Sequence, residues 1–214
     1  LVTGFIGVGL WIANQESTTL DIGLRQAFLL TNGAWLSIGL FGAIPLFLSD
    51  LNLSISDAIF ESVSGVTTTG STILPHIELA SAGILLWRAL LQWLGGIGIV
   101  VMAMAVLPML SVGGMQLFKT ESYDSADKVI PRATQLAGGI FIAYTTLTGF
   151  WALMLALAGM PGFDALAHAM TTIATGGYST RTLSIGAYDS WLIEVIIIGG
   201  MIIGSLPFAH YVAM

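Results

Sequence analysis

The sequence predicts an all-α polytopic membrane protein with two tandem repeats, each consisting of a span, a re-entrant pore helix and a second span. Three observations predict this fold class. The chain is 56% hydrophobic and only 8% charged, with a mean hydropathy of +0.90, whereas soluble domains carry about 25% charged residues. Several apolar segments reach the roughly 20 residues that cross a bilayer. Two polar stretches, 67–72 and 174–180, interrupt these segments in the same context.

Composition excludes several classes of function. The formal net charge of −6 argues against a nucleic-acid partner, because nucleic acid needs a clustered basic face. Without cysteine there is no disulfide and no thiolate metal site. The three histidines are scattered and lack an H-x-x-x-H spacing, which argues against a metal centre. We therefore expect the lipid bilayer to surround the chain and expect no cofactor.

The chain begins within an apolar segment. We expect residues 1–25 to hold the end of a preceding transmembrane helix, up to Ala13, and a cytoplasmic connection that includes Arg25. A signal peptide is not expected, because no basic n-region or A-x-A-like cleavage site is present. The sequence ends at Met214 without a polar tail. We expect the chain to be a fragment of a longer protein.

The first pore repeat is expected over 26–111. It comprises a span at 27–48, a pore helix at 54–66, the polar stretch 67–72 and a span at 84–110. Ser54 and Asp57 form a capping-box start, in which side-chain oxygens accept free backbone N–H groups. At about 1.5 Å per residue, helix 54–66 reaches only partway across a bilayer. Gly95 and Gly96 permit close helix packing, which we expect to be their role.

A polar loop follows at 112–132, and it holds Lys119, Lys128 and Arg132, three of the six basic residues. The positive-inside rule places this loop in the cytoplasm. The second pore repeat is expected over 133–214. It comprises a span at 133–159, a pore helix at 163–173, the polar stretch 174–180 and a span at 191–214.

The two repeats match at a fixed offset. Asp57 lies 13 residues before Gly70, and Asp164 lies 13 residues before Gly177, so the offset is 107. Both repeats return the chain to its starting side and therefore have the same topology. Internal repeats are common in transport proteins, where the site lies at the repeat interface. Parallel repeats around an axis normal to the membrane give the geometry of a pore.

The polar stretches have the chemistry of a cation filter. A re-entrant helix directs its partly negative C-terminal end into the membrane, and rings of carbonyls can replace the hydration shell of a cation. Gly70, Gly176 and Gly177 suit a positive or strained φ that turns successive carbonyls toward one axis. The hydroxyls of Thr68 and Thr175 can add oxygen ligands. A single Thr-Gly stretch would be explained as well by an ordinary turn or cap, but two matched copies favour a filter.

Four segments resemble a known family. They are Phe60-Glu61-Ser62-Val63-Ser64-Gly65-Val66-Thr67-Thr68-Thr69-Gly70, Leu91–Ile99, Gly113–Leu117 and Ile173–Thr180. They resemble the first filter, the following helix and loop, and the second filter of the Trk/Ktr/HKT superfamily of potassium transporters, TrkH-type subunits above all. These motifs are specific, and the likeness covers nearly the whole chain.

The resemblance implies a K⁺-translocating subunit with four span–pore–span repeats, homodimeric in a bacterial inner membrane and regulated by a cytosolic nucleotide-binding subunit. It implies that backbone carbonyls coordinate K⁺, namely those of Thr68, Thr69, Gly70, Thr175, Gly176 and Gly177. It places four filter-supporting residues beside them: Thr67, Ser71, Ala174 and Tyr178. The chain holds two of four repeats, so it would supply half a filter and would not conduct alone.

Five further polar residues lie in or near the predicted pore helices. Glu61 is predicted to pair with Arg88, since an unpaired charge in a membrane is costly; the alternative is that both snorkel to the interface. His168 occupies the Glu61 position of the second repeat, as a hydrogen-bonded structural histidine or as a proton relay. Asp57 and Asp164 are predicted to cap the pore helices, and the alternative is to attract cations at the mouth.

Two other functions compete with potassium transport. One is a non-conducting membrane subunit, or a remnant, that acts in assembly. The other is an intramembrane enzyme that uses His168 with Asp164 or Glu61. An enzyme of this kind needs a nucleophile or a metal constellation, and no third partner accompanies the histidine in the sequence. The sequence therefore favours transport, and we expect no enzyme.

Overall fold

The computed structural model describes residues 24–110 and 129–206, together with Phe208 and the isolated residues Gly4, Gly7–Gly9 and Ile12. The elements of the two long ranges are α2 (Leu24–Phe47), α3 (Ile55–Val66), η1 (Ile77–Leu79), α4 (Ala82–Leu110), α6 (Val129–Leu157), α7 (Gly162–Ile173), η3 (Ser184–Tyr188) and α8 (Trp191–Ser205). No strand occurs in these ranges, so the described part is all-α as predicted.

Among the described residues, three helices are long and apolar enough, by length and composition, to cross a membrane. The apolar segments are Phe28–Phe47, Ala82–Val100 and Ala137–Leu157. They correspond to the predicted spans at 27–48, 84–110 and 133–159. Large apolar side chains on these helices are exposed, among them Leu36 at 67% and Ile142 at 67%. Such exposure suits lipid, because a bilayer does not penalise apolar surface as water does.

Some predicted segments extend beyond the described residues. The apolar start of the chain lies outside them apart from the isolated residues, and so do positions 112–128 of the predicted cytoplasmic loop. Positions 129–132 of that loop belong to α6. The fourth predicted span is described as α8, a shorter apolar helix of 15 residues. Leu206 after it is extended, as is usual before a proline.

The two short helices have similar lengths but different starts. At α3, the Ser54 side chain accepts the Asp57 N–H (3.2 Å) and the Asp57 carboxylate accepts the Ser54 N–H (3.4 Å), which forms the predicted capping box. At α7, the N-cap is Pro161, and no side chain caps the helix. The prediction that Asp164 caps α7 is therefore wrong. Its carboxylate instead contacts Arg181, as described below.

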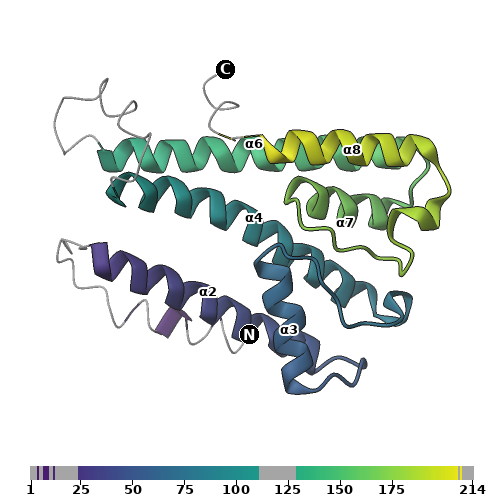
Figure 1. The fold of residues 1–214 in the computed structure, drawn as a ribbon, viewed down its shortest axis with the longest axis horizontal. Coiled ribbons are helices and arrows are strands. Elements are labelled where there is room, and N and C mark those ends of the chain that lie inside the picture. Colours follow the sequence, from purple (N-terminus) through teal and green to yellow (C-terminus); the bar gives the residue numbers. More distant parts are fainter. Residues whose placement is uncertain are drawn as a thin grey trace.

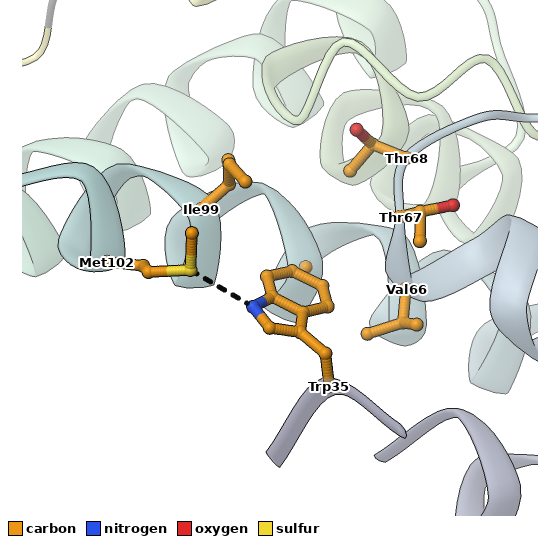
Figure 2. Close-up of a pocket in the computed structure, with 7 residues that line it drawn as sticks. Trp35, Val66, Thr67, Thr68, Ile99 and Met102 are labelled. Carbon is orange, nitrogen blue, oxygen red and sulfur yellow. Dashed lines mark hydrogen bonds between the residues drawn. The ribbon is translucent and has the colours of Figure 1, made fainter. Parts of the chain in front are cut away.

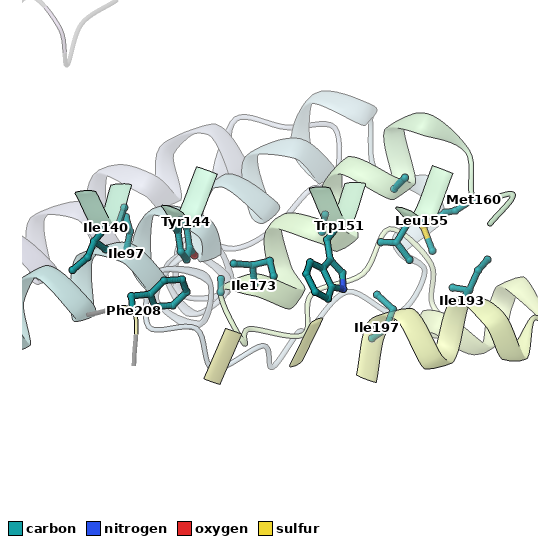
Figure 3. Packing of buried hydrophobic residues seen from close by; sticks show 13 residues of the cluster. Ile97, Ile140, Tyr144, Trp151, Leu155, Met160, Ile173, Ile193, Ile197 and Phe208 are labelled. Carbon is teal, nitrogen blue, oxygen red and sulfur yellow. The ribbon is translucent and has the colours of Figure 1, made fainter. Parts of the chain in front are cut away.

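Helix α4 connects the two repeats. Figure 1 shows it running through the middle of the structure, with α2 and α3 on one side and α6, α7 and α8 on the other. It packs against both short helices, α3 and α7. The largest buried cluster fills the second repeat and joins side chains of α6, α7 and α8, with Ile97 of α4 beside them (Figure 3). The short helices are thus held against a shared central helix.

Candidate functional site

The two polar stretches have the same backbone conformation. Thr68 and its counterpart Thr175 lie in the left-handed region, with φ of 54° and 53°. Gly70 and its counterpart Gly177 have φ of 78° and 87°. The left-handed region costs an L-residue about 1–2 kcal/mol, and it is unusual for a β-branched side chain. The same strained conformation occurs at equivalent positions of both repeats, so it is a property of the repeated motif.

The threonines at positive φ were missed by sequence reasoning, which assigned this conformation to the glycines alone. Of the three glycines expected to have a positive or strained φ, Gly70 and Gly177 have a positive φ and Gly176 does not. Position 176 requires a glycine for a different reason. A Cβ at this position would lie 2.3 Å from Oε1 of Gln92. The side chain of Gln92 occupies the space that a larger residue would need.

The backbone N–H groups of each stretch turn back to the preceding short helix. In the first stretch, Thr67, Thr68 and Thr69 donate to carbonyls of α3 at 2.9–3.0 Å. In the second, Ala174, Thr175 and Gly176 donate to the equivalent carbonyls of α7 at 2.8–3.1 Å. The acceptors are Val63, Gly65 and Ser64 in α3, and Met170, Thr172 and Thr171 in α7. All three pairs obey the offset of 107.

Six carbonyl oxygens of the stretches are left free, whereas those of Ser71 and Ser179 accept hydrogen bonds. Within residues 24–110 and 129–206, none of the six predicted ligands accepts a hydrogen bond through its carbonyl: Thr68, Thr69, Gly70, Thr175, Gly176 and Gly177. Gly176 is buried and Thr68 and Gly70 are half-buried, whereas Thr69, Thr175 and Gly177 are exposed. Buried carbonyls are nearly always paired. Free carbonyls and the negative ends of helix dipoles both attract cations. Among the described residues, no group of three or more His, Asp or Glu side chains could hold a metal ion.

The two stretches meet directly. A Cβ built on Gly70 would lie 2.0 Å from the carbonyl oxygen of Gly176. Gln92 of α4 is fully buried beside this contact and accepts the N–H of Tyr178 at 3.0 Å. Sequence reasoning missed Gln92. The signal that could have found it is an uncharged polar side chain within an apolar span.

Two glycines of α4 permit this arrangement. A Cβ on Gly95 would lie 1.9 Å from the carbonyl oxygen of Val66, and a Cβ on Gly96 would lie 3.0 Å from the Cβ of Ala174. Helix α4 therefore contacts the C-terminal end of α3 through one glycine and the residue that follows α7 through the next. This agrees with the packing role expected for both glycines.

The filter-supporting residues predicted from the sequence have identifiable partners. The hydroxyl of Thr67 donates to the Val63 carbonyl at 2.7 Å. The carbonyl of Ser71 accepts the hydroxyl of Ser64 at 2.6 Å. Ala174 is buried, and the hydroxyl of Tyr178 donates to the Glu61 carbonyl at 2.7 Å. Each contact fixes a stretch to a helix without using a predicted ligand carbonyl.

Glu61 and Arg88 form a buried ion pair. A terminal nitrogen of Arg88 lies 2.8 Å from Oε1 of Glu61, and the two side chains are 1% and 0% exposed. This is the pairing predicted from the sequence, and the burial excludes the snorkelling alternative. Glu61 also accepts the Thr72 hydroxyl (2.8 Å) and the Ile73 N–H (3.1 Å). The carboxylate therefore holds the chain just after the first stretch.

His168 is bonded through both ring nitrogens. Nδ1 lies 2.7 Å from the Asp164 carbonyl, to which it donates, so Nε2 accepts the Ser179 hydroxyl at 3.0 Å. These contacts support the structural interpretation of His168 over the proton relay. Asp164 is buried and forms an ion pair of 2.7 Å with Arg181. This contact turns its carboxylate away from the end of α7, which explains why it does not cap the helix.

A further contact joins the two loops after the stretches. Glu78 accepts the Thr182 N–H at 2.7 Å and also the Thr182 hydroxyl. The same hydroxyl accepts the Ile77 N–H at 3.0 Å. The bonds from Thr182 lower the pKa of Glu78 from 4.5 to about 2. Sequence reasoning did not identify this pair.

A cavity of about 250 Å³ lies beside the end of α3. It is lined by Trp35, Val66, Thr67, Thr68, Gly95, Ile99 and Met102. Figure 2 shows the Trp35 indole between Val66 and Met102, and its N–H donates to the Met102 sulfur at 3.4 Å. The cavity therefore lies between α2, α4 and the start of the first stretch.

Comparison with known proteins gives consistent matches over nearly the whole chain. A family model described as "TrkH: Cation transport protein" matches residues 1–213. The Trk system potassium uptake protein TrkI of Halomonas elongata is 47% identical over 192 residues, which are 87% of this chain and 38% of that protein. The Trk system potassium uptake protein TrkH of Escherichia coli K12 is 44% identical over 195 residues, 90% of this chain and 40% of that protein.

A solved structure has the same fold. The crystal structure of the potassium transporter TrkH from Vibrio parahaemolyticus matches with a TM-score of 0.77 and 35% identity. The match covers 92% of this chain and 39% of that one. The chain thus spans less than half the length of these relatives.

Proposed function

The chain belongs to the TrkH family of cation transport proteins, and from this premise we propose that it supplies two of the filter stretches through which potassium ions cross a membrane. The observation that carries the proposal is the set of six free carbonyls on two stretches of matching backbone. The names of its relatives, which are Trk system potassium uptake proteins, support potassium as the ion.

The mechanism follows from the direction of the backbone dipoles. Each short helix directs the negative end of its dipole toward the stretch that follows. The N–H groups of that stretch are bonded back to the helix, so its carbonyls are available to an ion. Carbonyl oxygens replace the water that the ion loses on entry, and weak multiple contacts let it leave again. The chain contributes two of four such stretches, which is half of the filter.

Membership of the TrkH family also supports proposals for the membrane location and the protein partners. We place the chain in the inner membrane of a bacterium, with the loop 112–132 on the cytoplasmic side. We propose that the full-length protein is a homodimer and binds a cytosolic nucleotide-binding regulatory subunit. The support is the resemblance to Trk-type systems and the cluster of basic residues in that loop, which follows the positive-inside rule.

The arrangement favours transport over the two alternatives. A role in assembly alone does not require carbonyl oxygens without partners, and free carbonyls are costly at membrane depth. An enzyme would need an available base, but both ring nitrogens of His168 are engaged by the Asp164 carbonyl and Ser179. The family is one of transporters.

The test uses the full-length protein that contains this chain, expressed in cells that lack potassium uptake. Gly70→Ser and Gly177→Ser should each reduce growth at low K⁺ or change the preference for K⁺ over Na⁺, because both residues have positive φ that a side chain resists. Protein levels in the membrane are measured in parallel. Wild-type growth and preference in both variants would refute the filter assignment.

A further inference from the structure

Buried polar groups form a connected line beside the two stretches, which passes through the backbone carbonyl and the hydroxyl of Ser179. The line begins at Glu61 in α3, passes through Arg88 in α4, and reaches Ser179 and His168 in the second repeat. Glu61, Arg88 and His168 are at most 2% exposed, and Ser179 is 9% exposed. Polar groups so deeply buried have a large energetic cost unless their bonds are satisfied. The line therefore depends on each of its members being in place.

Arg88 is the junction of this line. Its Nε donates to Glu61 at 2.8 Å, Nη2 donates to the Thr72 hydroxyl at 3.1 Å, and Nη1 donates to the Ser179 carbonyl at 3.2 Å. Thr72 and Ser179 are equivalent positions at the offset of 107. One guanidinium group thus holds the same point of both stretches. A planar group with donors in fixed directions can do this, whereas an ammonium group presents a single point of charge.

Tyr178 closes a ring of contacts around the arginine. The guanidinium carbon of Arg88 lies 4.0 Å from the centre of the Tyr178 ring, which is a cation–π contact. The hydroxyl of Tyr178 donates back to the Glu61 carbonyl at 2.7 Å. Tyr178 directly follows Gly177, one of the proposed ligands. A displacement of Arg88 would therefore be transmitted to the second stretch as well as to the first.

The second repeat has no equivalent pair of its own. His168 replaces Glu61 at the offset of 107, and Leu192 replaces Arg88 at the offset of 104 that aligns the following spans. The guanidinium group of Arg88, in the first repeat, therefore donates hydrogen bonds to both stretches. Because Glu61 balances its charge, the group adds no net positive charge that would repel a cation in the filter.

We propose that Arg88, held by Glu61, is a positioning residue that sets the spacing of the two stretches and thereby the preference for potassium over sodium. This inference rests on the proposed function. Selectivity has been explained by the size of the ion-binding site and by the electric field of the carbonyl dipoles. In both explanations it depends on the positions of the carbonyl oxygens. The hydrogen bonds and the ring contact of Arg88 go to residues other than the predicted ligands, so its effect acts through Thr72, Tyr178 and Ser179.

The experiment compares ion fluxes of the full-length protein in liposomes with K⁺, Rb⁺ or Na⁺ as the only permeant cation. Arg88→Lys keeps the positive charge but loses the planar set of N–H donors. Thr72→Val removes the hydroxyl that accepts from Arg88 and keeps the shape of the side chain. Each should lower the ratio of K⁺ to Na⁺ flux by about threefold or more, in the range for breaking contacts within one network. Glu61→Gln should lower it in the same direction.

The matched control is Trp87→Phe on the same helix. Trp87 donates its indole N–H to the Gly42 carbonyl of α2 at 2.9 Å and does not touch the stretches. This variant should alter stability while leaving the flux ratio at the wild-type value. A merely structural role of Arg88 would give the same result as the control, with less folded protein and an unchanged ratio.

The outcomes separate this inference from the proposed function. Wild-type vesicles without K⁺ flux would overturn the proposed function and this inference with it. Wild-type vesicles that select K⁺, together with Arg88→Lys and Thr72→Val proteins of unchanged ratio, would overturn the inference alone. If Arg88→Lys does not yield monodisperse protein, the ratios of Thr72→Val and Glu61→Gln decide.

Discussion

Gly70 lies against the carbonyl of Gly176, so close that a Cβ on Gly70 would be 2.0 Å from that oxygen. The two residues are far apart in the sequence and belong to different repeats. Their contact shows that the polar stretches are neighbours in space. It also means that the size of one glycine limits the position of a carbonyl in the other stretch.

Gly70→Ala should destabilise the protein more than Gly159→Ala. Both residues have positive φ, which costs an L-residue about 1–2 kcal/mol. Only the methyl group at 70 would also collide with a carbonyl oxygen, since no described residue lies within 4 Å of a Cβ at 159, between α6 and α7. Thermal unfolding of the full-length protein in detergent measures the difference. Equal loss of stability in the two variants would contradict the described contact.

Gly95→Ala should destabilise the protein by about 1–3 kcal/mol or more, the usual cost of inserting a methyl group into a packed site. The added Cβ would lie 1.9 Å from the Val66 carbonyl, where backbone cannot move freely. Gly149→Ala in α6 is the control, because nothing lies within 4 Å of its added Cβ. It should be neutral or stabilising by about 0.5–1 kcal/mol, since alanine favours a helix more than glycine. A Gly95→Ala protein as stable as this control would exclude close contact between α4 and α3.

Gly176→Ala should displace the side chain of Gln92, whose Oε1 would lie 2.3 Å from the added Cβ. The bond from the Tyr178 N–H to Gln92 would be lost with it. Shortening Gln92 to alanine in the same chain should recover part of the lost stability, with a coupling of about 0.5–3 kcal/mol for residues in contact. Strict additivity of the two single changes would show that the residues do not compete for space.

Glu78→Gln should weaken the contact between the two loops in a pH-dependent manner. Its folded pKa of about 2 lies below the ordinary value of 4.5. A lowered pKa stabilises the folded state above pH 4.5, and this contribution is lost as pH falls toward 2. The melting temperature of the variant should therefore be lower than that of the wild type at pH 7.

The difference between Glu78→Gln and wild type should shrink steadily below pH 4.5, because the wild-type carboxylate becomes protonated. Thr182→Val serves as a second variant, since it removes the hydroxyl that donates to Glu78. It should show the same trend with pH. A difference that stays constant from pH 7 to pH 3 would show that the ionised carboxylate is not the stabilising species.

Local patterns in the sequence predicted the elements and part of the site. The capping box at Ser54 and Asp57 is a contact between residues three apart, so it can be read from the sequence. The sequence also predicts the pair of Glu61 and Arg88, because charges in apolar segments need partners. The offset of 107 makes the two stretches equivalent in the sequence, and their equivalent residues have matching φ.

The remaining contacts depend on packing between distant residues. Asp164 sits where a cap is expected, but Arg181 provides a stronger partner for its carboxylate. The role of Gly176 depends on the position of Gln92, and Glu78 meets a threonine more than a hundred residues later. The positive φ of Thr68 and Thr175 runs against the preference of β-branched residues. No local signal in the chain indicates these features.

The partners of Arg88 also imply an order of assembly during synthesis. Glu61 precedes Arg88 by 27 residues, whereas Ser179 follows it by 91. Translation proceeds at about 5–20 residues per second, so Ser179 is synthesised on the order of 10 s after Arg88. During that interval Glu61 is the carboxylate that neutralises Arg88 as the first repeat enters the bilayer. The pair therefore protects a nascent membrane helix from an uncompensated charge well before any ion is transported.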